Sequence, residues 1–432
     1  MAGKKGTLPL HVKKKHFNHP GIELPIIQLL EQVKDPRSPS LFFRHSLTTI
    51  LFMTLTGLIC GATDWPKIIV VANGLTPWLS NYVDMSAGVP CERTFKNLLN
   101  ALHPDTLENV LRDLASLTRR NKPLDIISFD GQTSRGTADR HKNVKGIHLL
   151  NAWSSANGIC IGQIKIDDKS NEITAIPELM NVLDLKGSII TADALNTQKH
   201  IADVAIKNKA DYLLPVKGNQ PGLQAAVIAA FEVAENERTL AAALHERAII
   251  KAREQHDTNR LQQLITKGIP ACGLFFHNNP PEKSHGRIET RRCMTISAKA
   301  LPMAAEWQGV QSIIRIDRER ILAGKMSSER VYYISSLDPK KPEIIASAAR
   351  EHWGVEILHW FLDVAFEQDH SRYRDRVGAR NLATMRKMAL NALSNETSIR
   401  GGIKTRQFAA MCNPTYRDKI IENLFSSLNA DF

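Results

Sequence analysis

The sequence predicts an α/β protein: a mixed five-stranded sheet with flanking helices, a helical N-terminal domain and an inserted helical and β-rich module. Three observations carry this prediction. Residues 22–118 have helical spacing with short polar breaks. From residue 124, short apolar runs rich in β-branched residues alternate with longer helical segments. Residues 218–345 lose that alternation before an apolar, helical stretch follows.

The composition indicates a globular chain with an excess of positive charge. At 432 residues, the chain is long enough for two or three domains. It has 56 Lys and Arg residues against 44 Asp and Glu residues, a net charge of +12. This excess favours a polyanionic partner, with nucleic acid ahead of an anionic membrane surface. Six cysteines without a C-x-x-C pair argue against a disulfide framework or a zinc site and suit a reducing cytosol.

The N-terminal region, residues 1–120, is expected to be a basic arm followed by a helical domain. Its first 20 residues contain five lysines and no acid, with no apolar core close behind, so they predict an arm rather than a signal peptide. Helices are expected near GIELPIIQLLEQV, at 45–61 and over CERTFKNLLNALH. The apolar window 46–62 is short and contains several threonines, which favours a buried core helix over a membrane span.

Residues 121–217 are expected to hold the first part of a core with the element order β-β-β-α-β-α-β. A strand at 124–130 precedes a hairpin whose turn contains Asn157-Gly158. The remaining elements are a helix at about 173–184 started by Ser170 or Asn171, a strand at 188–194, a helix at about 197–208 and a strand at 211–216. This is the order of ribonuclease H-like folds, in which three antiparallel strands precede parallel crossovers.

Two acids end strands of this predicted sheet. Asp130, in DIISFDGQTSRG, ends the first strand, and Asp193 ends the fourth. These strands are neighbours in a ribonuclease H-like sheet, so both carboxylates would emerge at one edge. Turn chemistry is the alternative for Asp130, because Asp-Gly is a common loop opener. Lys217 ends a strand at the same edge, as a phosphate-contacting residue or as an ordinary strand-end lysine.

The inserted module, residues 218–345, is expected to be helical first and β-rich afterwards, with a hairpin at Gly324. Arginines in GRIETRRCMTIS are candidates for gripping a DNA backbone, although alternating Arg and Glu is also ordinary decoration of a strand surface. These candidates are Arg287, Arg291 and Arg292.

Residues 346–395 are expected to complete the core, followed by a C-terminal tail at 396–432. AAREHWGVEILHWFLDVAFEQDHSR predicts one apolar helix with a narrow polar stripe. With Glu356 at 0° and 100° per residue, Asp363 falls at about 340°, His352 at about 320° and His359 at about 300°. This stripe fits an edge helix with one wetted strip. It also fits a third ligand, Glu356, because carboxylates in an apolar wall are costly unless paired or bound to a cation.

Asp130, Asp193 and Glu356 together predict a site for two divalent cations. Hard oxygen ligands select Mg²⁺ or Mn²⁺. Two such ions roughly 3.5–4 Å apart activate a water or a 3′-hydroxyl and stabilise the leaving oxygen of an in-line phosphodiester displacement. The next predicted helix has basic residues on one face, which is either solvated or in contact with DNA phosphates. They are Arg372, Arg376, Arg380 and Lys387.

Long motifs follow one another along the chain, among them FDGQTSRG, KSNEITAIPELMNVLDLKGSIITADALNTQKHIA, ADYLLPVKGNQPGL and LHWFLDVAFEQDHSRYRDRVGARNLATMRKMALNAL. Over roughly residues 30–415, they resemble the H-repeat-associated, ISAs-type family of bacterial insertion-sequence transposases. The resemblance implies a DDE transposase with a ribonuclease H-like core and Mg²⁺ dependence, which cleaves transposon ends and transfers strands into target DNA. It places the family's acids on Asp130, Asp193 and Glu356.

The resemblance also implies partners and a location. These are double-stranded DNA, as terminal inverted repeats and as target, a homodimer or higher multimer on that DNA, and the bacterial cytoplasm at the nucleoid. The basic arm and helical leader are the candidates for recognising transposon ends.

One departure from the family pattern leaves two functions open. Family members usually read Ile-Glu-Asn-x-Leu-His-Trp, whereas residues 355–360 read Val-Glu-Ile-Leu-His-Trp, one residue shorter. The deletion rotates Glu356 by about 100° relative to the helix that follows. The chain is therefore either a metal-dependent transposase or a degenerate member that binds DNA without cutting it. A ribonuclease H-type host nuclease is a third hypothesis, which would cleave without preference for any repeat.

Overall fold

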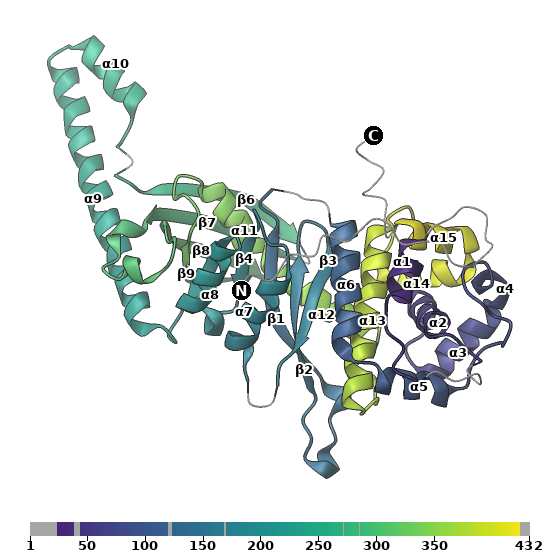
Figure 1. Ribbon diagram of the computed structural model, residues 1–432. Helices are drawn as coiled ribbons and strands as arrows, with labels where there is room; N and C mark the ends of the chain where they lie inside the picture. Colours follow the sequence, from purple (N-terminus) through teal and green to yellow (C-terminus); the bar gives the residue numbers. More distant parts are fainter. Residues whose placement is uncertain are drawn as a thin grey trace.

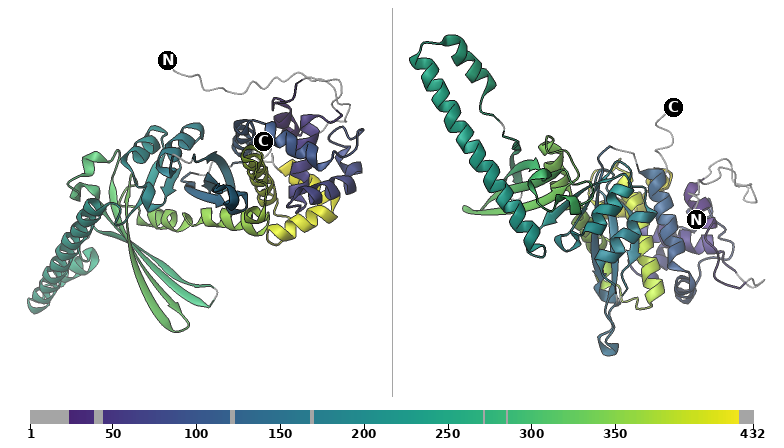
Figure 2. Two further views of the ribbon diagram at one scale, coloured as in Figure 1. Left: turned by 90° about the horizontal axis from the view of Figure 1, so that it is seen from below. Right: turned by 60° about the vertical axis from the view of Figure 1, so that its left-hand side comes forward.

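The computed structural model describes residues 24–38, 44–119, 123–167, 170–270, 272–284 and 286–423 (Figure 1). The basic arm expected in the first 20 residues lies outside this described part. A long sheet runs through the molecule, with a helical domain beside one end and a helical arm projecting beside the other (Figures 1 and 2).

Within the described residues, nine strands form one sheet in the order β3-β2-β1-β4-β5-β9-β8-β7-β6. Pairing is antiparallel except for β1–β4 and β4–β5, which are parallel. The strands are β1 (Ile126–Ser134), β2 (Ile147–Ser154), β3 (Ile159–Lys165), β4 (Ile189–Ala192), β5 (Asp211–Val216), β6 (Phe275–Ser284), β7 (Arg287–Ser297), β8 (Ser312–Leu322) and β9 (Lys325–Ser335).

The predicted order β-β-β-α-β-α-β is present between β1 and β5, but the predicted sheet of five strands is wrong. Strand β9 of the inserted module pairs with β5, from Leu213 opposite Ser335 to Val216 opposite Tyr332. Strands β8, β7 and β6 then follow, so the described sheet has nine strands. The physical reason is the edge of β5, whose backbone N–H and C=O groups need partners that an inserted antiparallel strand supplies.

The helices are α1 (Pro25–Glu31), α2 (Leu47–Ile59), α3 (Trp65–Gly74), α4 (Thr76–Leu79), α5 (Glu92–Ala101), α6 (Pro104–Thr118), α7 (Glu172–Val182), α8 (Lys199–Lys207), α9 (Pro221–Glu254), α10 (Thr258–Lys267), α11 (Pro342–Glu351), α12 (Gly354–Val364), α13 (Arg376–Asn395), α14 (Ile403–Cys412) and α15 (Pro414–Asn423). The predicted start of α7 is confirmed, because the Asn171 side chain accepts a hydrogen bond from the backbone N–H of Thr174.

The N-terminal and C-terminal helices share one hydrophobic core. Helix α2 lies at its centre with nearly all its residues buried, and α13 packs against α2, α5 and α6. The segment 396–432, expected as a tail, contains α14 and α15, and Tyr416 and Ile420 are buried in this core. In the part of the chain that the structure covers, every helix is too short or too polar to span a membrane.

Two further cores cover the two faces of the sheet. Ile127 and Phe129 of β1 contribute to a core with α7, α8 and α9, whereas Ile126 contributes to the opposite face, which α11 covers. The alternation follows from the two-residue side-chain period of a strand. It leaves even-numbered residues of β1, Asp130 among them, on the face toward α11 and α12.

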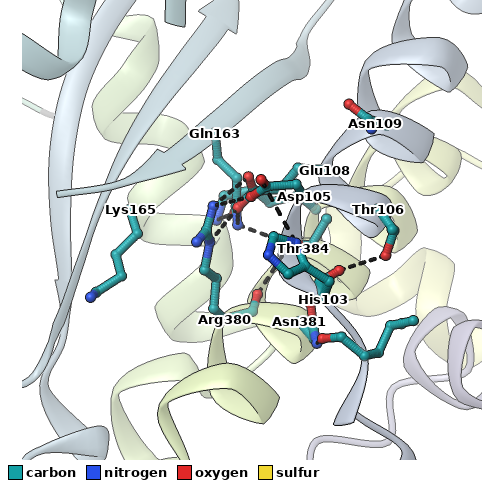
Figure 3. Close-up of polar contacts among 12 residues, drawn as sticks. His103, Asp105, Thr106, Glu108, Asn109, Gln163, Lys165, Arg380, Asn381 and Thr384 are labelled. Atoms are coloured by element: carbon teal, nitrogen blue, oxygen red, sulfur yellow. Dashed lines mark hydrogen bonds and ion pairs between the residues drawn. The ribbon is translucent and has the colours of Figure 1, made fainter. Parts of the chain in front are cut away.

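A buried polar network joins the helical domain to the sheet (Figure 3). The Arg380 guanidinium of α13 donates to both carboxylate oxygens of Glu108 on α6, at 2.7 Å each, and to Asp105 at 3.1 Å. Gln163 of β3 donates to the same Glu108 carboxylate at 2.9 Å and to Thr384 Oγ1 at 2.8 Å. The network therefore fixes α13 between the sheet and α6.

Replacing Arg380 by alanine should lower the free energy of unfolding by about 3–5 kcal/mol, because it leaves the buried Glu108 carboxylate without its charged partner. Urea unfolding followed by circular dichroism measures the loss. Arg372 is the matched control, since its side chain is exposed just before the same helix. Arg372→Ala should change stability by less than about 0.5 kcal/mol. Equal losses in the two variants would contradict the role of the network.

Candidate active site

The candidate site begins at the parallel pairing of β1 with β4. The register sets Ser128 opposite Thr191 and Phe129 opposite Ala192. Ser128 Oγ and Thr191 Oγ1 are hydrogen-bonded at 3.0 Å on a buried face. Asp130 and Asp193 each follow two residues later, so alternation brings both carboxylates to this same face, where they line one pocket.

Asp130 lies inside β1, so the prediction that it ends the strand is wrong. Beyond Asp130 the strand continues to Ser134, because β2 keeps pairing with it up to Ser134 opposite Ile147. The pairing with β4 is what ends, at Phe129. Gly131 also has a packing role rather than opening a loop. A Cβ at this position would lie 2.7 Å from His148 Nε2 and would collide with the Glu172 carboxylate.

The predicted single helix that carries Glu356 is broken into α11 and α12. Helix α11 ends at Glu351, and α12 starts at Gly354, whose lack of a side chain permits close packing: a Cβ there would lie 2.9 Å from Trp153 Nε1. The apolar side chains of this segment are not all covered, since Trp353, Ile357 and Trp360 are exposed. The break places Glu356 in the first turn of α12, with an exposed side chain.

Each aspartate faces a histidine from this broken segment. His352, between the two helices, has Nδ1 3.0 Å from Thr191 Oγ1 and Nε2 3.5 Å from Asp193 Oδ1. His359, on α12, has Nδ1 3.5 Å from Asp130 Oδ2. The two histidines therefore connect the α11–α12 segment to the two strands that carry the aspartates.

Four of the predicted functional residues share one pocket. Asp130, Asp193, Glu356 and Lys217 line a cavity of about 220 Å³, together with His352. Lys217 is exposed directly after β5, the strand beside β4. Glu329 and Arg318 also line it, so the cavity combines four carboxylates with an ammonium and a guanidinium group at the edge where β1 and β4 separate.

The two aspartates have opposite electrostatic environments. Burial, followed by the charges of Asp193 and Glu172, raises the pKa of Asp130 to about 7. The hydrogen bond from His352 holds the pKa of Asp193 below its ordinary value, and the charge of Lys217 adds to this effect. Burial lowers the pKa of His359 to about 4, so this imidazole is neutral near pH 7 and does not offset the Asp130 charge.

The chemistry of these residues fits a divalent cation. Asp130 is a carboxylate whose ionised form is disfavoured by burial and by neighbouring carboxylates, and a cation would remove that penalty. Carboxylate oxygens are the donors that Mg²⁺ and Mn²⁺ prefer. Within the described ranges, however, no three His, Cys, Asp or Glu side chains are grouped closely enough to hold a metal ion. The three acids therefore share a pocket without forming a closed cage.

Sequence reasoning missed Glu172 at this site. Its carboxylate is 3.3 Å from His148 Nε2 and accepts a hydrogen bond of 2.8 Å from Asn196 Nδ2. In the sequence, Glu172 directly follows the helix-start residue Asn171, where an acid is common and gives no sign of a site. Gly131 was a usable signal, because a glycine inside a strand often marks the close approach of another group.

The arginines predicted to contact DNA from the inserted module and from the segment before α13 differ in exposure and in their ion pairs. Arg372 and Arg292 are exposed, and the Arg292 guanidinium also lies 5.3 Å from the Phe276 ring centre. Arg287 is partly exposed, with Nε 3.8 Å from the Glu289 carboxylate. Arg291 forms ion pairs with Glu289 at 2.6 Å and with Glu282 at 3.6 Å. Arg292 and Arg372 are therefore the most accessible of these arginines.

The prediction that Arg380 and Lys387 belong to a DNA-contacting basic face of α13 is wrong. Lys387 is completely buried, donates to Gln163 Oε1 at 2.7 Å, and has its pKa lowered by burial to about 8. Arg380 is held by Glu108, and Arg376 donates to the carbonyl oxygen of Lys145 at 2.7 Å. The reason is that the sheet and the helical domain cover α13 from both sides, so its basic side chains bind polar groups of α6, of β3 and of the loop before β2.

Two family models match consecutive parts of the chain. The model described as DDE_Tnp_1-associated matches residues 27–115, and the model described as Transposase DDE domain matches residues 121–392. The second match covers β1 to β9 and most of α13, and therefore every residue of the carboxylate pocket.

Curated proteins from Escherichia coli are similar over nearly the whole chain. A protein of strain O157:H7 named "Putative transposase YncI" is 33% identical over 384 residues, which cover 88% of this chain and 90% of that protein. The "H repeat-associated putative transposase YhhI" of strain K12 is 31% identical over 388 residues, 87% of this chain and 92% of that protein. Among solved structures, a piggyBac transposase synaptic complex with hairpin DNA gives a TM-score of 0.39 at 12% identity over 94% of this chain and 78% of that chain, too low to support an inference.

In metal-free protein, Asp130→Asn should raise the free energy of unfolding by roughly 2–4 kcal/mol at pH 8 and by less at pH 5. The folded state raises the pKa of Asp130 from 3.8 to about 7. Between these values the folded state binds more protons than the unfolded state, so stability falls as the pH rises, and the neutral amide removes this loss.

Urea unfolding in EDTA at the two pH values measures this difference. Asp193→Asn is the control, because the folded state lowers the pKa of Asp193 and the carboxylate there stabilises the fold above its unfolded pKa. It should gain no stability at pH 8. If Asp130→Asn raised the free energy of unfolding equally at both pH values, the raised pKa assigned to Asp130 would be contradicted.

Proposed function

This chain belongs to the H-repeat-associated family of DDE transposases, and on that premise we propose that it cleaves DNA at transposon ends and transfers the strands into target DNA. The observation that carries the proposal is the pocket shared by Asp130, Asp193, Glu356 and Lys217. The reaction is an in-line phosphodiester displacement that depends on two Mg²⁺ or Mn²⁺ ions, on a core of ribonuclease H-like type.

Five side chains of the pocket have roles in this proposal. Bound Mg²⁺ or Mn²⁺ supplies activation of the attacking oxygen and stabilisation of the leaving oxygen. Asp130 and Asp193 hold the cations from the sheet, and Glu356 holds them from the first turn of α12. Lys217 attracts the scissile phosphate. His352 orients Asp193, because its other ring nitrogen is fixed by Thr191 Oγ1.

Different regions of the chain have different roles in the proposed reaction. Residues 1–120 recognise the terminal inverted repeats, residues 121–217 and 346–395 form the catalytic core, and residues 218–345 add the inserted module. Within the C-terminal region, 396–432, α14 and α15 belong to the helical domain. The partner is double-stranded DNA, and the active form is a homodimer or higher multimer that pairs two transposon ends.

A second candidate function is DNA binding without cleavage. It is favoured by one observation: the described acids share a pocket without forming a group that could hold a metal ion. Glu356 lies beside the shortened segment, so a misplaced third carboxylate would produce this outcome. The two functions differ in metal-dependent nicking and agree in DNA binding.

Wild-type protein should nick a duplex that carries the element's terminal repeat when Mn²⁺ is added. Asp130→Asn and Asp193→Asn should each lower the nicking rate by more than about 100-fold, because each removes a cation ligand. Gel assays measure nicking, and fluorescence anisotropy measures binding of the same duplex. Glu343→Gln, an exposed acid on α11 outside the pocket, is the control and should nick normally. Binding without nicking by the wild type would favour the second function.

Reversing Arg292 or Arg372 to glutamate should weaken binding to all duplex sequences similarly. Each phosphate contact that is lost should also reduce the slope of log K against log salt concentration by about 0.9. Anisotropy titrations between 50 mM and 200 mM salt measure both quantities. Arg260→Glu, an exposed residue on α10, is the control. Loss of affinity for one sequence alone would contradict a contact with the DNA backbone.

A further inference from the structure

Helix α9 of the inserted module projects from the body as an arm (Figures 1 and 2). It has 34 residues, about 50 Å of helix. Its first turns are anchored in the sheet core through Leu223, Val227 and Phe231. Further along, α10 packs against it. The outer part of α9 therefore has one side covered and another side toward solvent.

The uncovered side of the arm has the spacing of a coiled-coil seam. Six exposed positions follow one another at intervals of four, three, four, three and four residues. They are Val233, Glu237, Leu240, Leu244, Arg247 and Lys251. At 100° per residue they fall within about 80° of one another, whereas the buried Ala234 and Ala252 lie about 100° from their centre.

The three apolar residues of this seam are unusually exposed for their type. Val233 is 58% exposed, Leu240 is 62% exposed and Leu244 is 54% exposed. Leu240 and Leu244 occupy successive turns of this face, and Val233 lies two turns before Leu240, so the three form an apolar strip that Glu237 interrupts once. Such a strip on a projecting helix is typical of a surface that packs against another helix.

The seam is complementary to itself in the antiparallel direction. A two-fold axis level with Ala242 sets Leu240 opposite Leu244 of a second copy and Glu237 opposite Arg247. The outermost layer pairs Val233 with the aliphatic part of Lys251. In the described part of the structure, Glu237, Arg247 and Lys251 form no ion pair within the chain. Their charges are thus available to a partner.

We propose that this face of α9 joins two copies of the chain as an antiparallel, two-stranded coiled coil. The two-fold arrangement is isologous, which closes a dimer instead of extending a filament. A parallel pairing is disfavoured, because it would set Glu237 against Glu237 and Arg247 against Arg247. The charged layer therefore selects direction and register, and the leucines supply the apolar contact.

This inference extends the proposed function, because it names the surface through which the proposed multimer forms. Only the role of the dimer in pairing transposon ends rests on that proposed function. Its test requires neither DNA nor metal, so a failure here leaves the carboxylate pocket unaffected. The arm of one copy lies alongside the arm of the other in this assembly. Each catalytic core is then connected to its partner through the inserted module.

The test is a charge swap measured by sedimentation velocity on the full chain at micromolar concentrations, without DNA. The wild type should sediment as a concentration-dependent dimer. Glu237→Arg and Arg247→Glu should each raise the dimer dissociation constant by about tenfold or more. The double variant should restore it to within about threefold of wild type, since each arginine then faces a glutamate again. Glu246→Arg, exposed on the far side of α9, is the matched control and should dimerise normally.

Circular dichroism confirms that each variant is folded, and Leu240→Ala combined with Leu244→Ala supplies an independent loss of dimer. A wild type that stays monomeric would overturn the proposal. So would single reversals that leave dimerisation unchanged, or a double variant that fails to recover. An Arg247→Glu variant that loses only DNA affinity would assign the arm to DNA instead of a second copy.

Discussion

Parallel register between β1 and β4, which ends at Phe129 and Ala192, determines where the acids of the candidate site lie. The buried hydrogen bond between Ser128 and Thr191 fixes that register on the face toward α11 and α12. Asp130 and Asp193 follow on the same face, and His352 connects the second of them to Thr191. A shift of one residue in this pairing would turn one carboxylate toward the hydrophobic core on the other face.

The acids of the site are constrained to different degrees: the two aspartates are held by the sheet, whereas Glu356 is on the first turn of a helix. Asp130 is inside a strand that is paired on both sides up to Phe129, and burial with like charges raises the pKa of its carboxyl group. Glu356 is exposed in the first turn of α12, directly after the break between α11 and α12. Two carboxylates are thus positioned by the sheet, and the third depends on where a helix starts. This difference explains why the acids share a pocket without closing around a cation.

Local patterns predicted the parts of the fold that local chemistry determines. The turn at Asn157-Gly158, the cap at Asn171 and the alternation of strands with helices predicted the order from β1 to β5, although Asp130 lies inside β1 and not at its end. Non-local pairing could not be predicted in this way: β9 adds to β5, and α13 is covered on both sides, which buries Lys387 and partly covers Arg380. A helical wheel shows which residues share a face but not what covers that face. Glu172 was missed because it approaches Gly131 from a helix that is about 40 residues further along the chain, which local patterns do not show.

We propose that Asp130 and Asp193 converge to bind a divalent cation beside Lys217, with Glu356 as the third carboxylate of the site. Anomalous diffraction from crystals of the full chain grown with Mn²⁺ tests it most directly. We expect an anomalous peak between the Asp130 and Asp193 carboxylates, with Glu356 turned toward it. A structure with no peak at this position, in which His352 and His359 still contact the two aspartates, would contradict this proposal.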